Sequence, residues 1–590
     1  MDEGLERYAF TWPGKADAIR QAQTPSTATL RPDGDASVDW DTTENLYIEG
    51  DNLEVLKLLQ RGYHGKVKMI YIDPPYNTGH DFVYKDSFQD SIENYKEQAG
   101  LSRQSNADTS GRYHSDWLSM MYPRLRLARE LLRHDGIICI SIDENEDSNL
   151  QKVCNEVFGE VNFIAKIPTL CNPKGRSQDK YVATCHEYLL IYSKSELPSG
   201  SVSIPKTKDD LEKDYPLFDE NKKLYYRELE LRNTHREFGK FNRPNLYYPF
   251  YVDGNGRVYL SKANNTVEVY PDWEDGFQGC WTWSRKKSAE ESDYLSAKKV
   301  NGNWKIYRKS YAGEDGNLPL KQVKSIWIDK LFHTEKGQQA FNELFSTKNK
   351  IFQSPKSPYF IMQCIMMAQE KDCIVLDFFS GSATTAEAVL KLNRNDGGDR
   401  KFVLIQLPEA LDSDSPAAQM SFNTICQIGE ERIRRAGRKI KAEIEEENKQ
   451  LKLAEEPKPI PDIGFRVLKL DSSNFDRVEG GALVDNLIKP GRTNDDVIFE
   501  MMLKWGLELS LPMEKTEVAG YPITSVAANE LICCMDKGIT VEVLGAIAAL
   551  EPKRVFFLDS VLTDTIKLNA AQIFKRVSDK LGCEIELRTA

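Results

Sequence analysis

The stretch that most constrains this chain is Lys68-Met69-Ile70-Tyr71-Ile72-Asp73-Pro74-Pro75-Tyr76-Asn77. Its β-branched and aromatic residues predict a buried parallel strand, which must stop near Asp73 because proline cannot continue a strand ladder. In open α/β sheets, ligands bind beyond the carboxyl ends of the strands. The sequence therefore predicts a stiff ligand-binding corner at residues 73–76, although a plain proline turn after a core strand remains an alternative.

The side chains at this corner suit a planar ligand that carries an amino group. Asp73 offers carboxylate oxygens as acceptors, and the carbonyls of Pro74 and Pro75 offer further acceptors. The ring of Tyr76 provides a flat face for stacking. Because two acceptors can hold the hydrogens of an amine while the aromatic ring stacks on the ligand, the corner is a candidate site for chemistry on an exocyclic amine.

A second motif lies far downstream, at residues 372–385. It begins as a buried strand, opens into a turn of small residues and predicts a helix that begins near Ala386. Glycine lets a backbone approach a ligand, and the free amides at a helix start can face a polar group of that ligand. No G-x-x-x-x-G-K-S/T pattern occurs in the sequence, so this loop is not the phosphate-binding loop of a nucleoside triphosphatase.

Together, Asp73-Pro74-Pro75-Tyr76 and the loop from Asp377 to Thr385 resemble the catalytic and cofactor motifs of DNA amino-methyltransferases that use S-adenosylmethionine. The catalytic motif precedes the cofactor loop with a long insert between them, which resembles the β-group arrangement of these enzymes. Over its whole length the chain resembles the modification subunit of a type III restriction-modification system. Five further segments stand in the order of that family: 47–53, 116–125, 135–143, 186–194 and 352–357.

The resemblance implies an α/β fold: a doubly wound, Rossmann-like methyltransferase core with an inserted β-rich target-recognition domain and a small C-terminal α/β domain. It implies that Asp73, Pro74, Pro75 and Tyr76 are catalytic, and that the cofactor is bound by Asp51, Asp377, Phe379, Gly381, Ser382, Thr384 and Glu409. Asp51 has a second interpretation, because an Asp before a helix also serves as an N-cap. Many relatives carry an acid where Gln406 stands, so the ribose contact is open, with Glu409 slightly further on.

The activity implied is transfer of a methyl group from S-adenosylmethionine to the N6 amine of a flipped-out adenine in double-stranded DNA. Adenine is favoured over cytosine because relatives that act on cytosine more often carry Ser in place of Asp73. Two alternatives remain open: a stand-alone methyltransferase, and a specificity subunit that binds DNA without methylating it. An RNA or protein-amide substrate is a third account, which the aromatic and basic insert disfavours.

Composition narrows the class of protein further. The chain has 590 residues, 40% of them hydrophobic, and a formal net charge of −12, so any DNA contact must be local. Its 11 cysteines form no C-x-x-C pair, which predicts reduced thiols in the cytoplasm and no metal site. The sequence has no apolar run of about 18 residues and no export leader, so we expect a soluble protein without membrane contact.

Changes in composition and in hydrophobic period predict six parts. They are an N-terminal arm (1–44), the catalytic half of the core (45–165), the target-recognition insert (166–350), the cofactor-loop half (351–411), a charged helix with a linker (412–459) and a C-terminal interaction domain (460–590). Strands at 46–48 and 136–143 and helices at 53–61 and 115–133 are predicted in the catalytic half. Residues 77–112 are polar and predict a loop beside the catalytic corner.

The insert combines aromatic and basic residues. From residue 221 to residue 330 it holds 20 Lys and Arg against 14 Asp and Glu, whereas the whole chain is acidic. Phosphate contact requires positive charge, and aromatic rings can contact bases, so the segment is predicted to bind DNA through Trp281, Trp283, Arg285, Lys286 and Lys287. An ordinary solvated β-rich insert is the alternative. Asp253-Gly254-Asn255-Gly256 predicts a hairpin turn within it.

The last third of the chain carries no recognisable catalytic set. Residues 421–452 predict a long exposed helix with charged pairs, and prolines at 457–461 predict a linker. Strands are predicted at 463–470 and 554–558, and helices near 494–505, 527–535 and 569–581. We therefore expect this part to mediate assembly, as a homodimer and with a separate ATP-dependent restriction subunit, since the chain has no nucleotide-hydrolysing loop of its own.

Overall fold

The computed structural model describes residues 9–77, 110–176, 179–314, 316, 318–451, 456–476, 488–582 and 584–589. Most of the predicted polar loop, residues 78–109, lies outside these described ranges. The chain forms two compact units, which we call the core unit (1–202 and 324–590) and the insert unit (203–323). No helix in the described part of the chain is long and apolar enough to cross a membrane.

The core unit is built on a nine-stranded sheet in its described part, with the order β1-β18-β2-β17-β16-β3-β4-β6-β5. The strands from β18 to β4 run parallel, whereas β1 is antiparallel to β18 and β6 is antiparallel to both β4 and β5. In chain order the strands are β1 Ala28–Val38, β2 Leu46–Glu49, β3 Val67–Ile72, β4 Leu132–Ile142, β5 Phe163–Leu170, β6 His186–Ser193, β16 Ile374–Asp377, β17 Lys401–Gln406 and β18 Phe465–Ser472.

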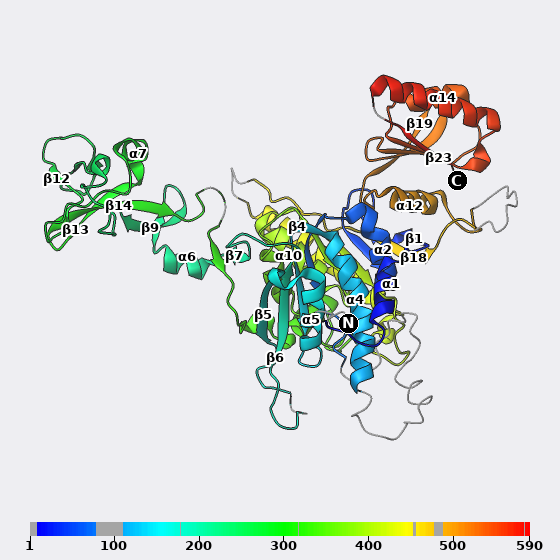
Figure 1. The fold of residues 1–590 in the computed structure, drawn as a ribbon, viewed down its shortest axis with the longest axis horizontal. Coiled ribbons are helices and arrows are strands. Elements are labelled where there is room, and N and C mark those ends of the chain that lie inside the picture. The colour runs from blue at the N-terminus through cyan, green and yellow to red at the C-terminus, as the bar shows by residue number, and fades with distance from the viewer. Residues whose placement is uncertain are drawn as a thin grey trace, which may run out of the picture. The chain divides into compact units, whose positions relative to one another are not determined.

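Helices cover both faces of this sheet, which confirms the doubly wound α/β fold (Figure 1). In strand β3, Ile70 and Ile72 pack in one apolar cluster with residues of the first helical layer, while Tyr71 faces the other side, 6.2 Å from the ring of Phe360. The first layer contains α1 Lys15–Gln23, α2 Asn52–Tyr63, α4 Ser110–Leu131, α5 Asp147–Phe158 and α12 Asn494–Trp505. The second contains α8 Thr334–Phe345, α9 Pro358–Met366, α10 Thr384–Asp396 and α11 Ile425–Lys449.

The strand order brings the two sequence motifs together. Strand β16 pairs in parallel with β3, so that Leu376 lies opposite Ile70, and β17 pairs with the other edge of β16. The carboxyl ends of adjacent parallel strands lie at the same edge of a sheet. Asp73, Asp377 and Gln406, which end or follow these three strands, therefore stand side by side at one edge although they are far apart in sequence.

Segments outside the predicted methyltransferase halves contribute strands to this sheet, which corrects two predictions. Residues 28–38 were expected in the N-terminal arm, yet they form the sheet strand β1, and α1 precedes it. Strand β18 was expected in the C-terminal domain, yet it lies between β1 and β2. The reason is long-range pairing: Leu30 of β1 lies opposite Leu470 of β18, and such a partner is invisible in a local hydrophobic pattern.

The C-terminal part forms a five-stranded sheet in its described residues, with α13 Val541–Ala548 and α14 Asp564–Leu581. Its strands are β19 Met513–Val518, β20 Tyr521–Val526, β21 Leu531–Cys534, β22 Arg554–Phe557 and β23 Glu586–Thr589. The helix predicted near 527–535 is wrong. Residues 527–529 have positive φ angles and form a turn, after which the buried run of β21 begins, because a short apolar run does not distinguish a buried strand from a helix.

Helix α11 confirms the predicted long helix, but its exposure was predicted wrongly. One face is buried along its length, including Ile428, Arg432, Ile433 and Ile440. The density of charged residues led to the prediction of a solvent-exposed helix. The apolar residues between them form a stripe along the helix, which packs on α8 and α10. This helix is therefore part of the core unit.

The insert unit is a small β-rich body. Its strands are β7 Ser203–Pro205, β8 Leu217–Asp219, β9 Leu224–Glu230, β10 Phe250–Val252, β11 Val258–Tyr259, β12 Val267–Val269, β13 Leu295–Val300, β14 Asn303–Tyr311 and β15 Leu320–Gln322, with helices α6 Lys208–Asp214 and α7 Arg285–Glu290. The predicted turn at 253–256 joins β10 and β11, as expected. An apolar cluster that includes Phe250, Trp281 and Ile306 forms its core.

Candidate active site

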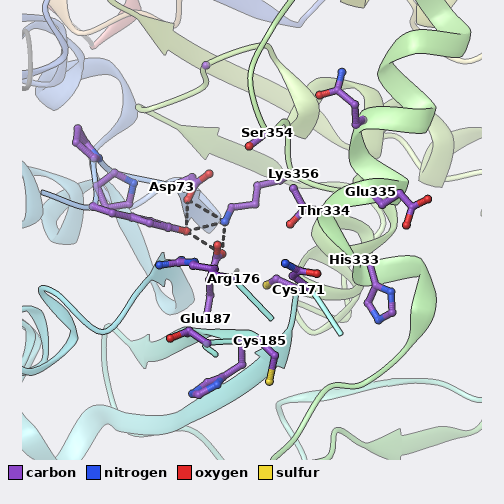
Figure 2. Close-up of a pocket in the computed structure, with 18 of the residues that line it drawn as sticks. Asp73, Cys171, Arg176, Cys185, Glu187, His333, Thr334, Glu335, Ser354 and Lys356 are labelled. Atoms are coloured by element: carbon purple, nitrogen blue, oxygen red, sulfur yellow. Dashed lines mark hydrogen bonds and ion pairs between the residues drawn. The ribbon is translucent and has the colours of Figure 1, made fainter. Parts of the chain in front are cut away.

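A cavity of about 890 Å³ lies at the carboxyl ends of β3, β16 and β17. One wall carries the catalytic corner and the cofactor loop: Asp73, Pro74, Pro75, Tyr76, Phe379, Gly381, Gln406 and Glu409. The opposite wall comes from the segment that joins β5 to β6, from the start of β6 and from the start of α8, including Arg176, Glu187, His333 and Glu335 (Figure 2). The volume is in the range of small-molecule and cofactor sites, which is about 300–1,000 Å³.

Helix α4 stabilises the proline corner through a hydrogen bond. The indole Nε1 of Trp117, a fully buried side chain, donates to the carbonyl of Pro75 at 2.7 Å. Asn77, which follows the corner with φ of 58°, donates from Nδ2 to the buried carboxylate of Glu146. These two contacts tie both ends of the Pro75–Asn77 segment to the core unit beside the cavity.

Asp73 belongs to a half-buried network that joins four side chains (Figure 2). The hydroxyl of Tyr76 donates to Asp73 Oδ1 at 2.8 Å and lies 3.1 Å from Glu187 Oε2. The ammonium of Lys356 lies 2.5 Å from Glu187 Oε2, 2.6 Å from the Tyr76 hydroxyl and 3.5 Å from Asp73 Oδ1. A cation thus stands between the carboxylates of Asp73 and Glu187, on the Oδ1 side of Asp73.

Burial and charge oppose one another in this network. Burial raises the pKa of Asp73 above its usual value, and the nearby Lys356 ammonium opposes that rise. For Glu187 burial acts in the same direction, but Lys356 outweighs it and the pKa is lowered. Burial acts to lower the pKa of Lys356, yet the two carboxylates outweigh it and the pKa is raised. The cation therefore stabilises the ionised form of both acids: it outweighs burial at Glu187 and offsets part of the effect of burial at Asp73.

Glu187 and Lys356 were not predicted as site residues. Both stood inside segments that supported the resemblance, 186–194 and 352–357, and the available signal was a charged residue beside an apolar or proline-containing run. Their meeting requires β6 and the segment before α9 to face each other across the cavity. Sequence reasoning could not supply this, because the two residues are far apart in the chain and neither forms a local motif with Asp73.

The cofactor loop follows β16. Gly381 has φ of 52°, and its amide donates to Gln406 Oε1 at 2.7 Å. Asp377 is buried and accepts the Phe379 amide at 3.0 Å and the Thr385 hydroxyl at 2.6 Å. Burial raises the pKa of Asp377 to about 7. Gln406, at the position where relatives carry an acid, thus braces the loop in this structure while also lining the cavity.

The structure separates the predicted cofactor residues into two groups. Phe379, Gly381 and Glu409 line the cavity. The others make contacts within the fold: Asp51 caps α2 by accepting the Leu53 and Glu54 amides, Asp377 braces the loop, and the hydroxyls of Ser382 and Thr384 bind Arg432. The alternative interpretation of Asp51 as an N-cap is therefore correct for its side chain.

The lining residues fit S-adenosylmethionine. Phe379 offers an aromatic face, and Glu409 offers a carboxylate whose pKa burial raises. A Cβ added at Gly381 would meet Phe352 at 3.4 Å and would project from a backbone in the left-handed region, so this position favours glycine next to a ligand. Among the described residues, no group of three or more His, Cys, Asp or Glu side chains could hold a metal ion.

The predicted DNA-binding residues of the insert unit also separate into two groups. Trp281 and Trp283 are buried, and Trp281 Nε1 donates to the Tyr248 carbonyl at 2.7 Å, so these two rings build the core of the unit and are not available for base contact. That part of the prediction is wrong because alternating Trp residues in a short strand-like run are equally typical of a core. Arg285, Lys286 and Lys287 are exposed on α7 and stay a prediction.

Residues 67–454 match the model of a protein family described as DNA methylase. The chain belongs to this family of DNA methyltransferases. It is 30% identical to the type III restriction-modification enzyme EcoPI Mod subunit of Escherichia phage P1, over 99% of this chain and 91% of the relative. It is 29% identical to the EcoP15I Mod subunit of Escherichia coli over the same shares, and 34% identical to the StyLTI Mod subunit of Salmonella typhimurium over 75% of this chain and 65% of the relative.

These similarities extend over both the catalytic half and the C-terminal part of the chain. The protein is accordingly a DNA adenine methyltransferase of the type III modification class, with S-adenosylmethionine as methyl donor. The resemblance inferred from the motifs is confirmed. These similarities do not identify the residues that perform each step of the reaction.

Proposed function

We propose that the cavity holds an adenine turned out of the DNA helix and that its N6 amine is methylated at the Asp73 corner. The observation that carries this proposal is the position of a half-buried carboxylate, Asp73, at the cavity wall and one strand away from the loop of Phe379 and Gly381. A paired base cannot bring its amine into an enclosed cavity, so it must leave the stack, at a cost of a few kcal/mol.

Asp73 and the Pro74 carbonyl have the chemistry to activate the amine. Its lone pair is delocalised into the ring and is a poor nucleophile. Accepting both hydrogens draws the nitrogen towards tetrahedral geometry and aims the lone pair at the methyl group, which S-adenosylmethionine supplies when bound. Tyr76 and Lys356 both lie on Oδ1 of Asp73, and among the described residues no hydrogen bond is made to Oδ2, which leaves that oxygen for the amine.

The first test is the Asp73→Ala variant assayed on DNA that carries the recognition site. We expect methylation to fall by two or more orders of magnitude, because one of the two acceptors is lost, while the affinity for S-adenosylmethionine changes little. Tyr76→Ala should chiefly weaken capture of the flipped base. Mass spectrometry of the product identifies the reaction. Full activity in Asp73→Ala, or 4-methylcytosine in place of 6-methyladenine, contradicts the assignment.

A second test addresses the cofactor loop. Gly381→Trp places a bulky side chain at a position that lines the cavity and has φ of 52°, so we expect binding of S-adenosylmethionine to be lost. Isothermal titration calorimetry measures this directly, and Gly397→Trp serves as a control. Gly397 also has a positive φ, of 64°, but no atom lies within 4 Å of a Cβ added there. Unchanged cofactor affinity in Gly381→Trp removes the loop from the cofactor site.

We further propose that the insert unit recognises the DNA site, through a face made by residues 232–247 and 270–278. Here Arg236 lies 4.5 Å from the centre of the Trp273 ring and Lys240 lies 4.4 Å from that of Tyr247. Phe241 is 71% exposed. Cations held over aromatic rings, next to an uncovered ring, are suited to bind phosphates and to contact bases.

The two candidate faces of the insert unit can be compared in one experiment. One triple variant changes Arg236 and Lys240 to Gln and Phe241 to Ala, and the other changes Arg285, Lys286 and Lys287 on α7 to Gln. Fluorescence anisotropy then gives DNA affinity at several salt concentrations. We expect the first variant to lose affinity and to lower the salt slope by roughly one per phosphate contact removed. If only the second loses affinity, α7 is the recognition face.

The assembly proposal follows the class of relatives. Their names describe them as Mod subunits of restriction-modification enzymes, and we propose that this chain likewise acts with a restriction subunit and as a homodimer, with the C-terminal sheet as the assembly part. Light scattering of the full chain, alone and mixed with a candidate restriction subunit, gives the masses. A monomer that methylates DNA and binds no such subunit supports the stand-alone methyltransferase instead.

A further inference from the structure

Helix α11 reaches the cofactor loop through one buried side chain, Arg432. The guanidinium is fully enclosed, and its Nη1 donates to the Ser382 carbonyl at 3.3 Å and to the Ser382 hydroxyl at 2.8 Å. The same nitrogen contacts the hydroxyl of Thr384. Its Nε donates to the carboxylate of Glu387 at 2.8 Å. Arg432 therefore binds three oxygens of the cofactor loop, although its helix α11 follows all the methyltransferase motifs in the sequence.

The loop is in need of such support. Ala383 has φ of 60° and ψ of 38°, a left-handed conformation that is unfavourable for any residue with a Cβ, and it caps α10 without a side-chain hydrogen bond. Gly381, two residues earlier, also has a positive φ. Gln406 holds the loop at the Gly381 amide, and Arg432 holds it at Ser382 and Thr384. Hydrogen bonds with Gln406 and with Arg432 therefore hold the turn before and after Ala383.

Charge balance beneath the loop adds a second constraint. Glu387 is almost fully buried, and its two oxygens face Arg432 and Lys391, which is 2.5 Å away. The guanidinium also lies 5.3 Å from the centre of the Phe341 ring on α8, the helix whose Glu335 lines the cavity. One side chain therefore connects α11, α8 and the cofactor loop.

We infer that Arg432 is a positioning residue for S-adenosylmethionine, which makes helix α11 a working part of the methyl-donor site. Arg432 does not line the cavity, and it acts by holding Ser382 and Thr384 so that the Gly381 backbone keeps its left-handed conformation at the cavity wall. A shift of this turn moves the Phe379 and Gly381 surface against which the cofactor packs. The inference rests on the loop assignment made under the proposed function.

The test separates loop positioning from general stability. In Arg432→Met, Glu387 loses one of its two cationic partners, so the protein is destabilised for reasons unrelated to the cofactor. The double variant Arg432→Met/Glu387→Gln removes that buried charge as well, while the three oxygens of the loop remain unbound. Arg438→Met is the matched control, because Arg438 lies on the same helix, is 68% exposed and pairs only with groups of α11 in the described part of the chain.

Three quantities are measured for each variant: the melting temperature, DNA affinity by anisotropy, and the Kd for S-adenosylmethionine by calorimetry. We expect the double variant to recover most of the melting temperature of the wild type while its Kd for the cofactor rises at least tenfold and its DNA affinity is retained. Arg432→Lys, which keeps the charge but not the forked donors, should fall between wild type and Arg432→Met. Arg438→Met should match the wild type in all three.

A double variant that binds S-adenosylmethionine within twofold of the wild type overturns the inference. Equal losses of cofactor and DNA affinity, in step with the melting temperature, also overturn it, since they indicate a purely structural ion pair. Gly381→Trp distinguishes this failure from failure of the loop assignment. If Gly381→Trp abolishes cofactor binding and the Arg432 variants do not, the loop assignment stands and only the role of Arg432 is lost.

Discussion

At the residue scale, the cavity depends on a lysine placed between two carboxylates. Lys356 contacts Glu187 and the Tyr76 hydroxyl and lies 3.5 Å from Asp73. A carboxylate that must accept hydrogens from an amine has to be ionised, and burial works against that ionisation. The lysine offsets part of the effect of burial from the side of Oδ1, and Oδ2 is the oxygen proposed to receive the amine.

Lys356→Met is therefore expected to shift the pH profile of methylation. The pKa of Asp73 is already raised by burial, and removing the ammonium raises it further, so the acidic limb of the profile of kcat moves to higher pH. Loss of a charge-assisted contact of about 1.5–3 kcal/mol corresponds to activity at neutral pH that is lower by a factor of roughly 10 to 150. Lys348→Met, at an exposed lysine outside the cavity lining, is the control. An unshifted profile removes this role of Lys356.

Asp377 gives a stability prediction with a definite sign. Its pKa is raised from 3.8 to about 7, so the folded state binds more protons than the unfolded state between these values, and its contribution to the free energy of unfolding falls as pH rises from about 4 through 7. The amide introduced by Asp377→Asn cannot titrate. The melting temperature of the wild type minus that of the variant should therefore decrease between pH 4 and pH 8, and a difference that increases contradicts the assignment.

At the scale of elements, the position of a residue within a strand or helix decided its role more than its type. Trp281 was predicted on a DNA-binding surface, but it packs at 5.1 Å from the Phe250 ring in the core of the insert unit. Arg432 was predicted on an exposed charged helix, but it is buried under the cofactor loop. The β-rich insert and the long helix were both predicted correctly from the local sequence. Packing against distant residues decided which side of each element is buried.

Trp281→Ala is expected to destabilise the insert unit by about 3–5 kcal/mol, because it leaves a cavity and an unpaired Tyr248 carbonyl. Limited proteolysis and the melting profile should show unfolding of residues 203–323, while binding of S-adenosylmethionine by the core unit persists. Lys286→Ala, at an exposed neighbour, should leave the melting profile unchanged. A stable Trp281→Ala protein with reduced DNA affinity alone would restore Trp281 as a recognition residue.

At the scale of the whole molecule, a segment near the N-terminus and a segment that follows the methyltransferase motifs complete the central sheet. Strand β1 pairs with β18, and β18 in turn pairs with β2, so residues near 30 and near 470 complete one sheet. Helix α12 also contacts β1 and α2. The segment predicted to be a separate interaction domain therefore begins inside the methyltransferase core. Any separate assembly domain must begin after β18.

A truncation after Leu411 tests this closure. It removes α11 with Arg432 and leaves β2 without its neighbour β18. We expect loss of cofactor binding and of solubility together with any assembly, since an uncovered strand edge and an apolar helix groove become exposed. A truncation after Leu511, which keeps β18 and α12, should retain far more cofactor binding. A soluble, cofactor-binding product ending at Leu411 contradicts this account.

The sequence by itself determined the chemistry and its place at strand ends. In Asp73-Pro74-Pro75-Tyr76 the prolines require the strand to end, and in the loop at Gly381 the glycine permits the backbone to turn. Both are local constraints, which can be recognised without knowledge of the fold. Cofactor, reaction class and the α/β core follow from them and from the family resemblance they carry.

Only the tertiary structure decided which distant groups complete the site. The groups concerned are Glu187 on β6, Lys356 in the segment before α9, and Arg432 on α11. Nothing in the sequence next to each residue indicates which distant residue it contacts. The same holds for β1 with β18 and for the buried Trp281. The physical reason is that burial, and the pairing of a charge or a strand edge that burial requires, is a property of the packed chain and has no period in the sequence.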